Sequence, residues 1–356
     1  MVWHNRLVRI GIAVVCSVSL QLHSFGDEPK ALVVLGAAGE PEYGTIFKAS
    51  GNRWKGAFGE AAIKLLDGTE SDEKFELVKN ADESVSKDEQ PTVAAESHRQ
   101  QILDWINRQE PQGDSPVPSD SESELLRDEV RWLVLIGHGT TDRSGSKFNL
   151  SGPDLSEKEL SAALKNTTRK WVIVNCSSSS GPFIAELSGP NRIVITATKS
   201  GAEQNYSRFA DYLSRSLTDP DSDLDHDSQI SVLEAFLASS SGVARFYQDE
   251  GRLASEQSLL DDNGDKRGTP ALFFRGLKAI KAPSDGLKLD GEIAKRMIIT
   301  KLSDAVPLTN ENASKAQEIE SKIELLRQKK AEIDEREFAD RLEALLIELA
   351  DILLPK

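Results

Sequence analysis

The segment from Trp171 to Phe183 reads WVIVNCSSSSGPF, an apolar run followed by polar turn residues, a glycine and a proline. Such a run is typical of a short strand that is buried on both faces and opens into a turn and a helix. Two further runs have the same character, WLVLI at 132–136 and RIVITA at 192–197. Short buried strands that alternate with helices predict a parallel sheet with helices on both of its faces.

Helical spacing of apolar residues surrounds these strands. The sequence predicts helices at 54–66, 98–106, 156–165, 183–187, 207–217 and 231–238. The run ALVVLG at 31–36 ends at a glycine and predicts one more buried strand. We therefore expect a three-layer α/β domain over residues 27–275, with a mostly parallel sheet. In such sheets ligands bind beyond the carboxyl ends of the strands.

Residues 1–26 are predicted to be a secretory signal peptide. Two arginines precede the apolar run IGIAVVCSVSL at 10–20, and Ser24 and Gly26 supply small residues before the expected cleavage site. The apolar run is short for a membrane span, which needs about 20 residues. We expect an exported protein (periplasmic, secreted or at the cell surface) with no stable membrane span after cleavage. A retained anchor is the alternative.

The composition excludes several classes of protein. The 356 residues include 43 basic and 58 acidic side chains, which gives a net charge of −15. This charge repels nucleic acid and anionic lipid, so we expect neither as a partner. The two cysteines, Cys16 and Cys176, are too few for a disulfide-stapled scaffold or a cysteine-rich zinc module.

The chain changes character after residue 275. Residues 276–313 form a mixed connector, and two helix-start signals follow, Ser314 with Gln317 and Asp334 with Glu337. Apolar residues recur at helical spacing after each start. The sequence predicts a helical hairpin, similar to a short coiled coil, over residues 314–353. Its apolar stripe is expected to pack on the same protein or on a second copy.

His138 and Ser178 are the candidate catalytic pair. His138 follows one predicted strand directly, between two glycines, and Ser178 follows the next strand. Because neighbouring parallel strands end at one edge of a sheet, we expect the two side chains to face each other within about 3–7 Å. The amide of Gly139 is placed to donate to a developing oxyanion.

A histidine at the end of one strand and a nucleophile at the end of the next resembles the caspase and legumain clan of cysteine peptidases. The resemblance covers about residues 31–275 and includes the loop SGAE at 200–203. It implies a caspase-like fold with a peptide or protein ligand at the strand ends. In the clan, the nucleophilic cysteine lies three residues before the turn glycine, a place that Ser178 holds here. Cys176 is a less favourable alternative nucleophile.

The loop that sets specificity also departs from the family. In legumain-like enzymes an arginine follows a tyrosine in the loop after the first strand, whereas here Gly44 follows Tyr43. The asparagine specificity that the resemblance would imply is therefore not carried over.

The segment from Asp223 to Glu234 reads DLDHDSQISVLE and matches an EF-hand calcium loop. The six ligand positions of such a loop fall on Asp223, Asp225, Asp227, the Gln229 carbonyl, Ser231 and Glu234. Ser228 replaces the usual turn glycine, at a cost of about 1 kcal/mol. The spacing predicts bound calcium; the alternative is an acidic, solvated turn.

A shorter acidic cluster occurs at 261–265, where the chain reads DDNGD. Asx turns are a common use of such residues, and the cluster is interpreted as one rather than as a metal site.

Three functions remain open. The first is an exported caspase/legumain-like peptidase homologue that binds calcium, has degenerate cysteine-peptidase catalysis and serves a binding or scaffold role, because a serine holds the nucleophile position. The second is an active peptidase or hydrolase that uses Ser178 with His138. The third is a structural protein that assembles through the hairpin at 314–353.

Overall fold

The structure is a computed structural model. It describes residues 29–69, 97–108, 130–280 apart from Asn166 and Thr168, 289–302, several positions between 312 and 330, and 333–353. The predicted signal peptide, part of the connector and part of the first hairpin helix lie outside the described residues.

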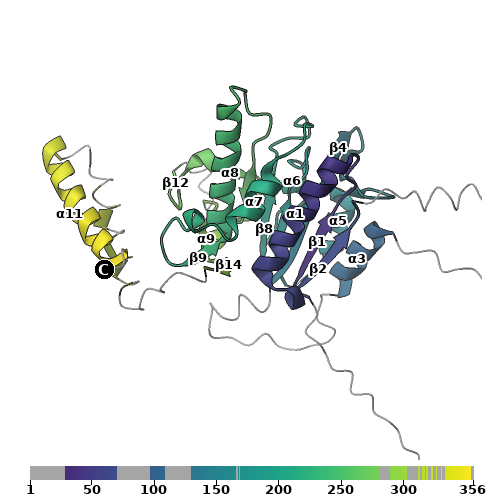
Figure 1. Ribbon diagram of the computed structural model, residues 1–356, viewed down its shortest axis with the longest axis horizontal. Helices are drawn as coiled ribbons and strands as arrows, with labels where there is room; N and C mark the ends of the chain where they lie inside the picture. Colours follow the sequence, from purple (N-terminus) through teal and green to yellow (C-terminus); the bar gives the residue numbers. More distant parts are fainter. Residues whose placement is uncertain are drawn as a thin grey trace, which may run out of the picture.

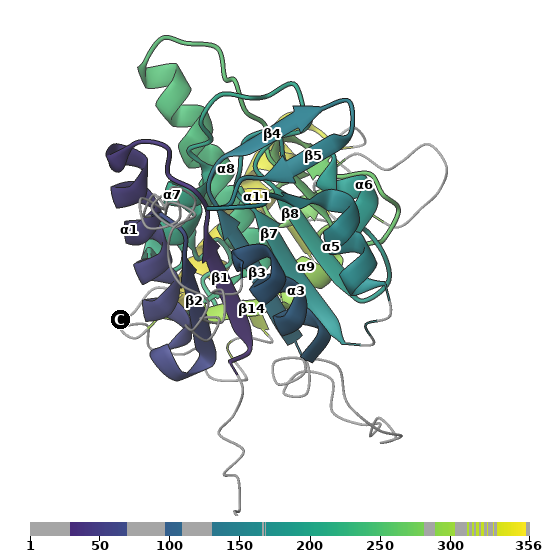
Figure 2. The ribbon, with the colours of Figure 1, turned by 90° about the vertical axis from the view of Figure 1, so that its right-hand side faces the viewer.

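Seven strands form the central sheet in the order β11-β10-β8-β7-β3-β1-β2 (Figures 1 and 2). The last five strands of this order run parallel to one another: β1 (Ala31–Leu35), β2 (Ile63–Asp67), β3 (Val130–Ile136), β7 (Lys170–Asn175) and β8 (Arg192–Thr196). At the other edge, β10 (Leu259–Asp261) pairs antiparallel with β8, and β11 (Thr269–Pro270) pairs antiparallel with β10. The predicted mostly parallel sheet is confirmed.

Helices cover both faces of the sheet (Figure 2). One face carries α1 (Pro41–Phe58), α7 (Phe209–Ser216) and α8 (Val232–Asp249), and the other carries α3 (His98–Arg108), α5 (Glu157–Leu164) and α6 (Phe183–Leu187). Alternate residues of β1 belong to the two cores: Val33 lies in the core that includes Trp54 of α1, and Val34 in the core that includes Trp105 of α3. The fully buried strands explain the unbroken apolar runs in the sequence.

Several short strands and helices lie outside the central sheet and its two helical layers. β4 (Gly139–Asp142), β5 (Gly145–Phe148) and β6 (Leu155–Ser156) form a small antiparallel sheet directly after His138. Between α7 and α8, β9 (Gln229–Ser231) pairs with β14 (Ile298–Lys301). The remaining short elements are η1 (Glu60–Ala62), η2 (Pro220–Ser222), η3 (Ala271–Phe273), β12 (Phe274–Arg275), β13 (Lys278–Ala279) and α9 (Glu292–Arg296).

The helix expected at 54–66 is wrong in its bounds. The helix α1 starts earlier, where Pro41 supplies a favourable first residue, and it ends at Phe58. Gly59 then adopts φ +83, a conformation that ends the helix. Ile63–Asp67 becomes β2 because its apolar residues find a partner in β1. That partner is distant in sequence, so helical periodicity could not reveal it.

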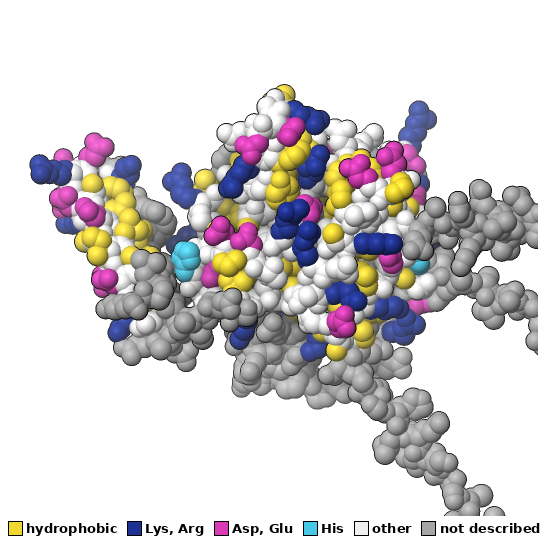
Figure 3. Space-filling model, in the orientation of Figure 1, with side chains coloured by type: hydrophobic (Ala, Val, Ile, Leu, Met, Phe, Trp, Pro, Cys, Tyr) yellow, Lys and Arg dark blue, Asp and Glu magenta, His cyan; other side chains and the backbone are white. Residues whose placement is uncertain are grey.

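The C-terminal helix α11 (Glu335–Leu353) begins where the start signal indicates. The Asp334 carboxylate accepts hydrogen bonds from the amides of Arg336 and Glu337 and so caps the helix. Figure 3 shows an apolar stripe along α11 between charged side chains. Leu346 and Ile347 are exposed apolar residues of this helix. The division of the chain into separate units stays a prediction. None of the described helices is long and apolar enough to cross a membrane.

The turn after β7 tolerates no side chain at Gly181. A Cβ there would overlap the backbone of Lys199 and Ser200, whereas Gly56 in α1 faces open space. Gly181→Ala should destabilise the protein by about 1–3 kcal/mol through overpacking. Gly56→Ala, its matched control, should stabilise by about 0.5–1 kcal/mol through helix propensity. Thermal and denaturant unfolding measure both. Equal effects of the two substitutions would contradict this packing.

Candidate functional site

The candidate site lies where β3 and β7 end. These strands are parallel neighbours, with Leu135 in register with Asn175, so the segments that follow them leave the same edge of the sheet. The amide of Cys176 still donates to the carbonyl of Leu135, at 2.8 Å. Hence His138 and Ser178 both begin their turns at this edge, as the sequence led us to expect.

Ser178 is buried, and its hydroxyl is bonded to the backbone of Gly139. The Gly139 amide donates to Ser178 Oγ at 3.1 Å, and the same hydroxyl donates to the Gly139 carbonyl at 3.0 Å. A side chain at Gly139 would overlap the Ser178 carbonyl, so the close approach needs glycine. Among the described residues, no hydrogen bond joins Ser178 to His138. Their side-chain separation of about 3–7 Å stays a prediction.

His138 is oriented by a backbone carbonyl. Its Nε2 lies 3.2 Å from the Ala38 oxygen, and because a carbonyl only accepts, Nε2 carries the proton. The ring packs edge-on to Tyr43 at 4.8 Å between centroids, with Phe47 and Tyr206 also beside it. Burial lowers the pKa of His138 and outweighs the opposing influence of Ala38 and Glu40. The imidazole is therefore neutral near pH 7, with Nδ1 unprotonated.

Cys176 belongs to the core rather than to the site. Its thiol is buried among the residues between the sheet and helices α1, α7 and α8. Burial, and then the charge of Glu256, raises the pKa of this thiol far above its ordinary value. A thiol that stays protonated at neutral pH is a poor nucleophile.

The serine run holds the turn in place. The amide and hydroxyl of Ser177 both donate to the Asn175 side-chain oxygen, at 3.0 and 2.6 Å. Ser180 accepts from the amides of Ala197 and Thr198 and ties the turn to the end of β8. These bonds make the run a structural feature of the turn. Serine side chains in turns commonly form such local hydrogen bonds, so the run of four serines in the sequence is also typical of a purely structural turn.

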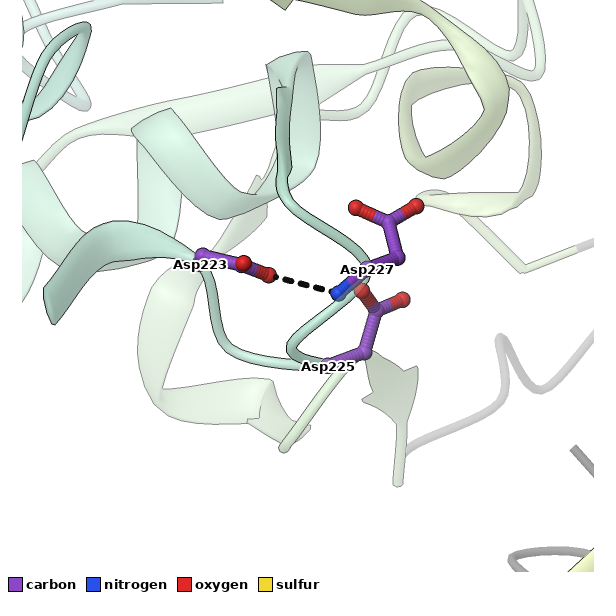
Figure 4. A group of neighbouring side chains, drawn as sticks. All are labelled: Asp223, Asp225 and Asp227. Atoms are coloured by element: carbon purple, nitrogen blue, oxygen red, sulfur yellow. Dashed lines mark hydrogen bonds between the residues drawn. The ribbon is translucent and has the colours of Figure 1, made fainter. Parts of the chain in front are cut away.

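The acidic loop brings three carboxylates together. One oxygen from each of Asp223, Asp225 and Asp227 lies within 4.8 Å of the others (Figure 4). Asp223 accepts from the amides of Asp227 and Ser228, at 3.1 and 2.9 Å. Ser228 has φ +69, the left-handed conformation that the missing glycine would favour. The loop therefore closes despite the serine.

Glu234 turns back over this loop from the start of α8. Its Oε1 accepts from the amides of Leu224 and Asp225, at 2.8 and 3.3 Å. Its Oε2 accepts from the amide and hydroxyl of Ser231, which completes a capping box for α8. Gln229 and Ser231 lie in β9, which β14 holds by backbone pairing. All six predicted ligand residues thus belong to one closed loop.

The charges in the loop are poorly compensated. Burial, and then the carboxylates of Glu234 and Asp227, raise the pKa of Asp225 to about 7. Asp225 Oδ1 is buried without a hydrogen-bond partner in the described part of the chain, and Lys295 Nζ lies 3.9 Å from the other oxygen, Oδ2. Hard divalent cations prefer a cluster of oxygen ligands such as these carboxylates. The residues present fit calcium.

Comparison with solved structures finds similar chains. The chain is similar to the crystal structure of the Drosophila initiator caspase Dronc, with 12% identity, a TM-score of 0.36, and coverage of 75% of this chain and 94% of that chain. A match this distant carries no argument about function, which depends on the site itself. No protein-family model matches the chain, and no curated protein does.

The bonds between Ser178 and Gly139 predict a stabilising role for this serine. Ser178→Ala removes one partner from both the amide and the carbonyl of Gly139 and should destabilise the protein by about 1–3 kcal/mol. Ser161→Ala, which removes an exposed hydroxyl bond to the Glu186 carbonyl, should change stability by less than about 1 kcal/mol. Denaturant unfolding compares the two. Unchanged or increased stability of Ser178→Ala would contradict the structural role.

Proposed function

We propose that this chain is an exported, calcium-binding protein of caspase-like fold whose strand-end site holds a peptide or protein ligand without cleaving it. The observation that carries this proposal is the pair of hydrogen bonds between the Ser178 hydroxyl and the backbone of Gly139. They occupy the groups that catalysis would need.

A serine nucleophile must donate its proton to a base as it attacks, while amides stabilise the oxyanion. Here the Ser178 hydroxyl donates a hydrogen bond to the Gly139 carbonyl, and the Gly139 amide donates one to the Ser178 oxygen. Freeing both groups breaks two buried hydrogen bonds, at a cost of about 1 kcal/mol each. The hydroxyl is also far less acidic than the cysteine thiol of the family. Both factors favour binding over hydrolysis.

Calcium fits this proposal as a structural ion. The loop 223–234 joins α7 to α8, two helices that cover the face of the sheet on which His138 lies. An ion held by the loop would neutralise its carboxylates and fix the first turn of α8. With serine in place of the turn glycine, we expect a Kd on the order of 10⁻⁴ to 10⁻³ M, typical of extracellular modules.

An active hydrolase is the second candidate, and the state of His138 favours it. The Ala38 carbonyl orients the ring as the third group of a catalytic triad does, and leaves Nδ1 free to accept a proton. A neutral imidazole is the form that a general base requires.

Activity separates the two candidates. The wild-type protein, Ser178→Cys and Ser178→Cys with His138→Ala are incubated with a fluorogenic peptide library, with and without calcium. We expect no cleavage by wild type. Ser178→Cys should react with iodoacetamide faster than wild type, and His138→Ala should slow that reaction. Cleavage by wild type that Ser178→Ala abolishes would establish the hydrolase instead.

Calcium should raise the midpoint of thermal unfolding, and more at pH 7.5 than at pH 5.5. The pKa of Asp225 is raised from 3.8 to about 7. The calcium-free protein is therefore most stable when Asp225 is protonated, and it loses stability as the pH rises from about 4 through 7. Calcium displaces that proton and removes the repulsion at the higher pH. Scanning calorimetry in calcium and in chelator measures this effect.

The matched variants for this experiment are Glu234→Gln and Asp249→Asn. Glu234→Gln keeps the shape of the side chain and removes the charge, and should abolish most of the calcium-dependent shift. Asp249 is exposed at the end of α8, and its substitution should leave the shift unchanged. A midpoint that calcium does not move in wild type would reduce this loop to an acidic turn.

A further inference from the structure

The segment 261–269, interpreted from its sequence as an Asx turn, repeats the backbone of the loop 223–231. In each segment the fourth and sixth residues have positive φ. These angles are 57° at His226 and 69° at Ser228 in the first, and 80° at Gly264 and 68° at Lys266 in the second. Left-handed conformations at serine and lysine are uncommon. The two segments therefore share an unusual conformation, although their sequences differ.

The side chains of the two segments also accept equivalent hydrogen bonds. In each, the fifth residue accepts from the amide of the seventh: Gln229 donates to Asp227, and Arg267 donates to Asp265, both at 2.8 Å. The first residue also accepts from amides of its own loop, although the donors differ: the fifth and sixth residues donate to Asp223, and the fourth, Gly264, donates to Asp261 at 3.1 Å. Carboxylate oxygens of both loops thus accept hydrogen bonds from amides of their own turn.

The second segment has no glutamate at its twelfth position, but Asp290 supplies the missing carboxylate. Asp290 Oδ1 accepts from the amides of Asp262 and Asn263, at 3.1 and 3.3 Å. These are the second and third residues of the loop, the same two positions that donate to Glu234 Oε1 in the first loop. The other oxygen of Asp290 accepts from the hydroxyl of the ninth residue, Thr269, as Glu234 Oε2 accepts from Ser231.

The second cluster contains a buried carboxylate oxygen that has no hydrogen-bond partner. Asp261 is fully buried, and its Oδ2 has no hydrogen-bond partner. Its carboxyl experiences the charge of Asp265, and Asp290 in turn experiences the charge of Asp261. In the described part of the chain, no lysine or arginine forms a salt bridge with Asp261 or Asp290. Buried carboxylates without a counter-charge are costly unless a cation joins them.

Asp262 explains how Asp290 is held against the loop. Its carboxylate accepts from the amides of Gly291, Ile293 and Ala294 at the start of α9. These bonds fix the residue that follows Asp290 to the second residue of the loop. Asp262 is therefore committed to the helix and is a positioning residue rather than a ligand.

We propose that Asp261, Asn263, Asp265 and Asp290 hold a second Ca²⁺, with the carbonyl of Arg267 at the seventh position. All of these ligand atoms are oxygens, as calcium requires, and the residues hold positions 1, 3, 5 and 7 of the loop, with Asp290 in the place of Glu234. The site is discontinuous in sequence, because its last carboxylate comes from beyond β13. The second site would hold its ion whether or not the first loop binds calcium.

Counting bound ions tests this site. Equilibrium dialysis of the full-length protein against ⁴⁵Ca²⁺ at millimolar concentration should give two ions for wild type and for the Asp249→Asn control. Asp290→Asn and Asp265→Asn should each lose one ion, because both keep the shape and an accepting oxygen but remove the charge. Glu234→Gln should also lose one ion, and Glu234→Gln with Asp265→Asn should lose both.

The variants separate the two sites. Two ions in both Asp290→Asn and Asp265→Asn would overturn the second site, as would a single wild-type ion that only Glu234→Gln removes. A single ion that Asp290→Asn removes and Glu234→Gln retains would support the second site and overturn the first. If Asp290→Asn does not fold by circular dichroism, Asp265→Asn decides, since Asp265 is partly exposed.

Discussion

The parallel pairing of β3 with β7 is the constraint on which the rest of the site depends. Because the two strands end at one edge, the turn that begins with Cys176 is bonded to β3, and Ser178 meets Gly139. The contact is so close that it requires glycine at position 139. A sheet of antiparallel neighbours would place these two turns at opposite edges.

Much of the sheet could be predicted from sequence, because burial on both faces produces continuous apolar runs such as 132–136. The predictions failed where a distant partner decides the structure. Ile63–Asp67 is a strand only because β1 lies beside it. The Ala38 carbonyl that orients His138 is a backbone group, which no residue type reveals. Asp290 joins the loop at 261–269 from a separate segment, so no local spacing could assign it.

The serine-rich turn shows why a motif is weaker evidence than the bonds its residues make. From sequence, Ser178 occupies the place of a nucleophile next to a histidine. In the structure its hydroxyl has both a donor and an acceptor in Gly139, and its neighbours Ser177 and Ser180 bond to Asn175 and to the end of β8. A hydroxyl with satisfied partners in a buried site contributes to stability first. Any chemistry at this position must compete with that contribution.

The two acidic loops are closed in the same way. Each follows an element of the main fold and gathers carboxylates that burial disfavours, and each is closed by an acid that accepts from the second and third loop amides. In the first loop Glu234 also caps α8. In the second loop Asp262 caps α9 and accepts from the amide of Gly291, the residue after Asp290. Because a cation would relieve the repulsion in both loops, its binding energy would act directly on these helix starts. If both loops bind a cation, the starts of α8 and α9 would then depend on its concentration.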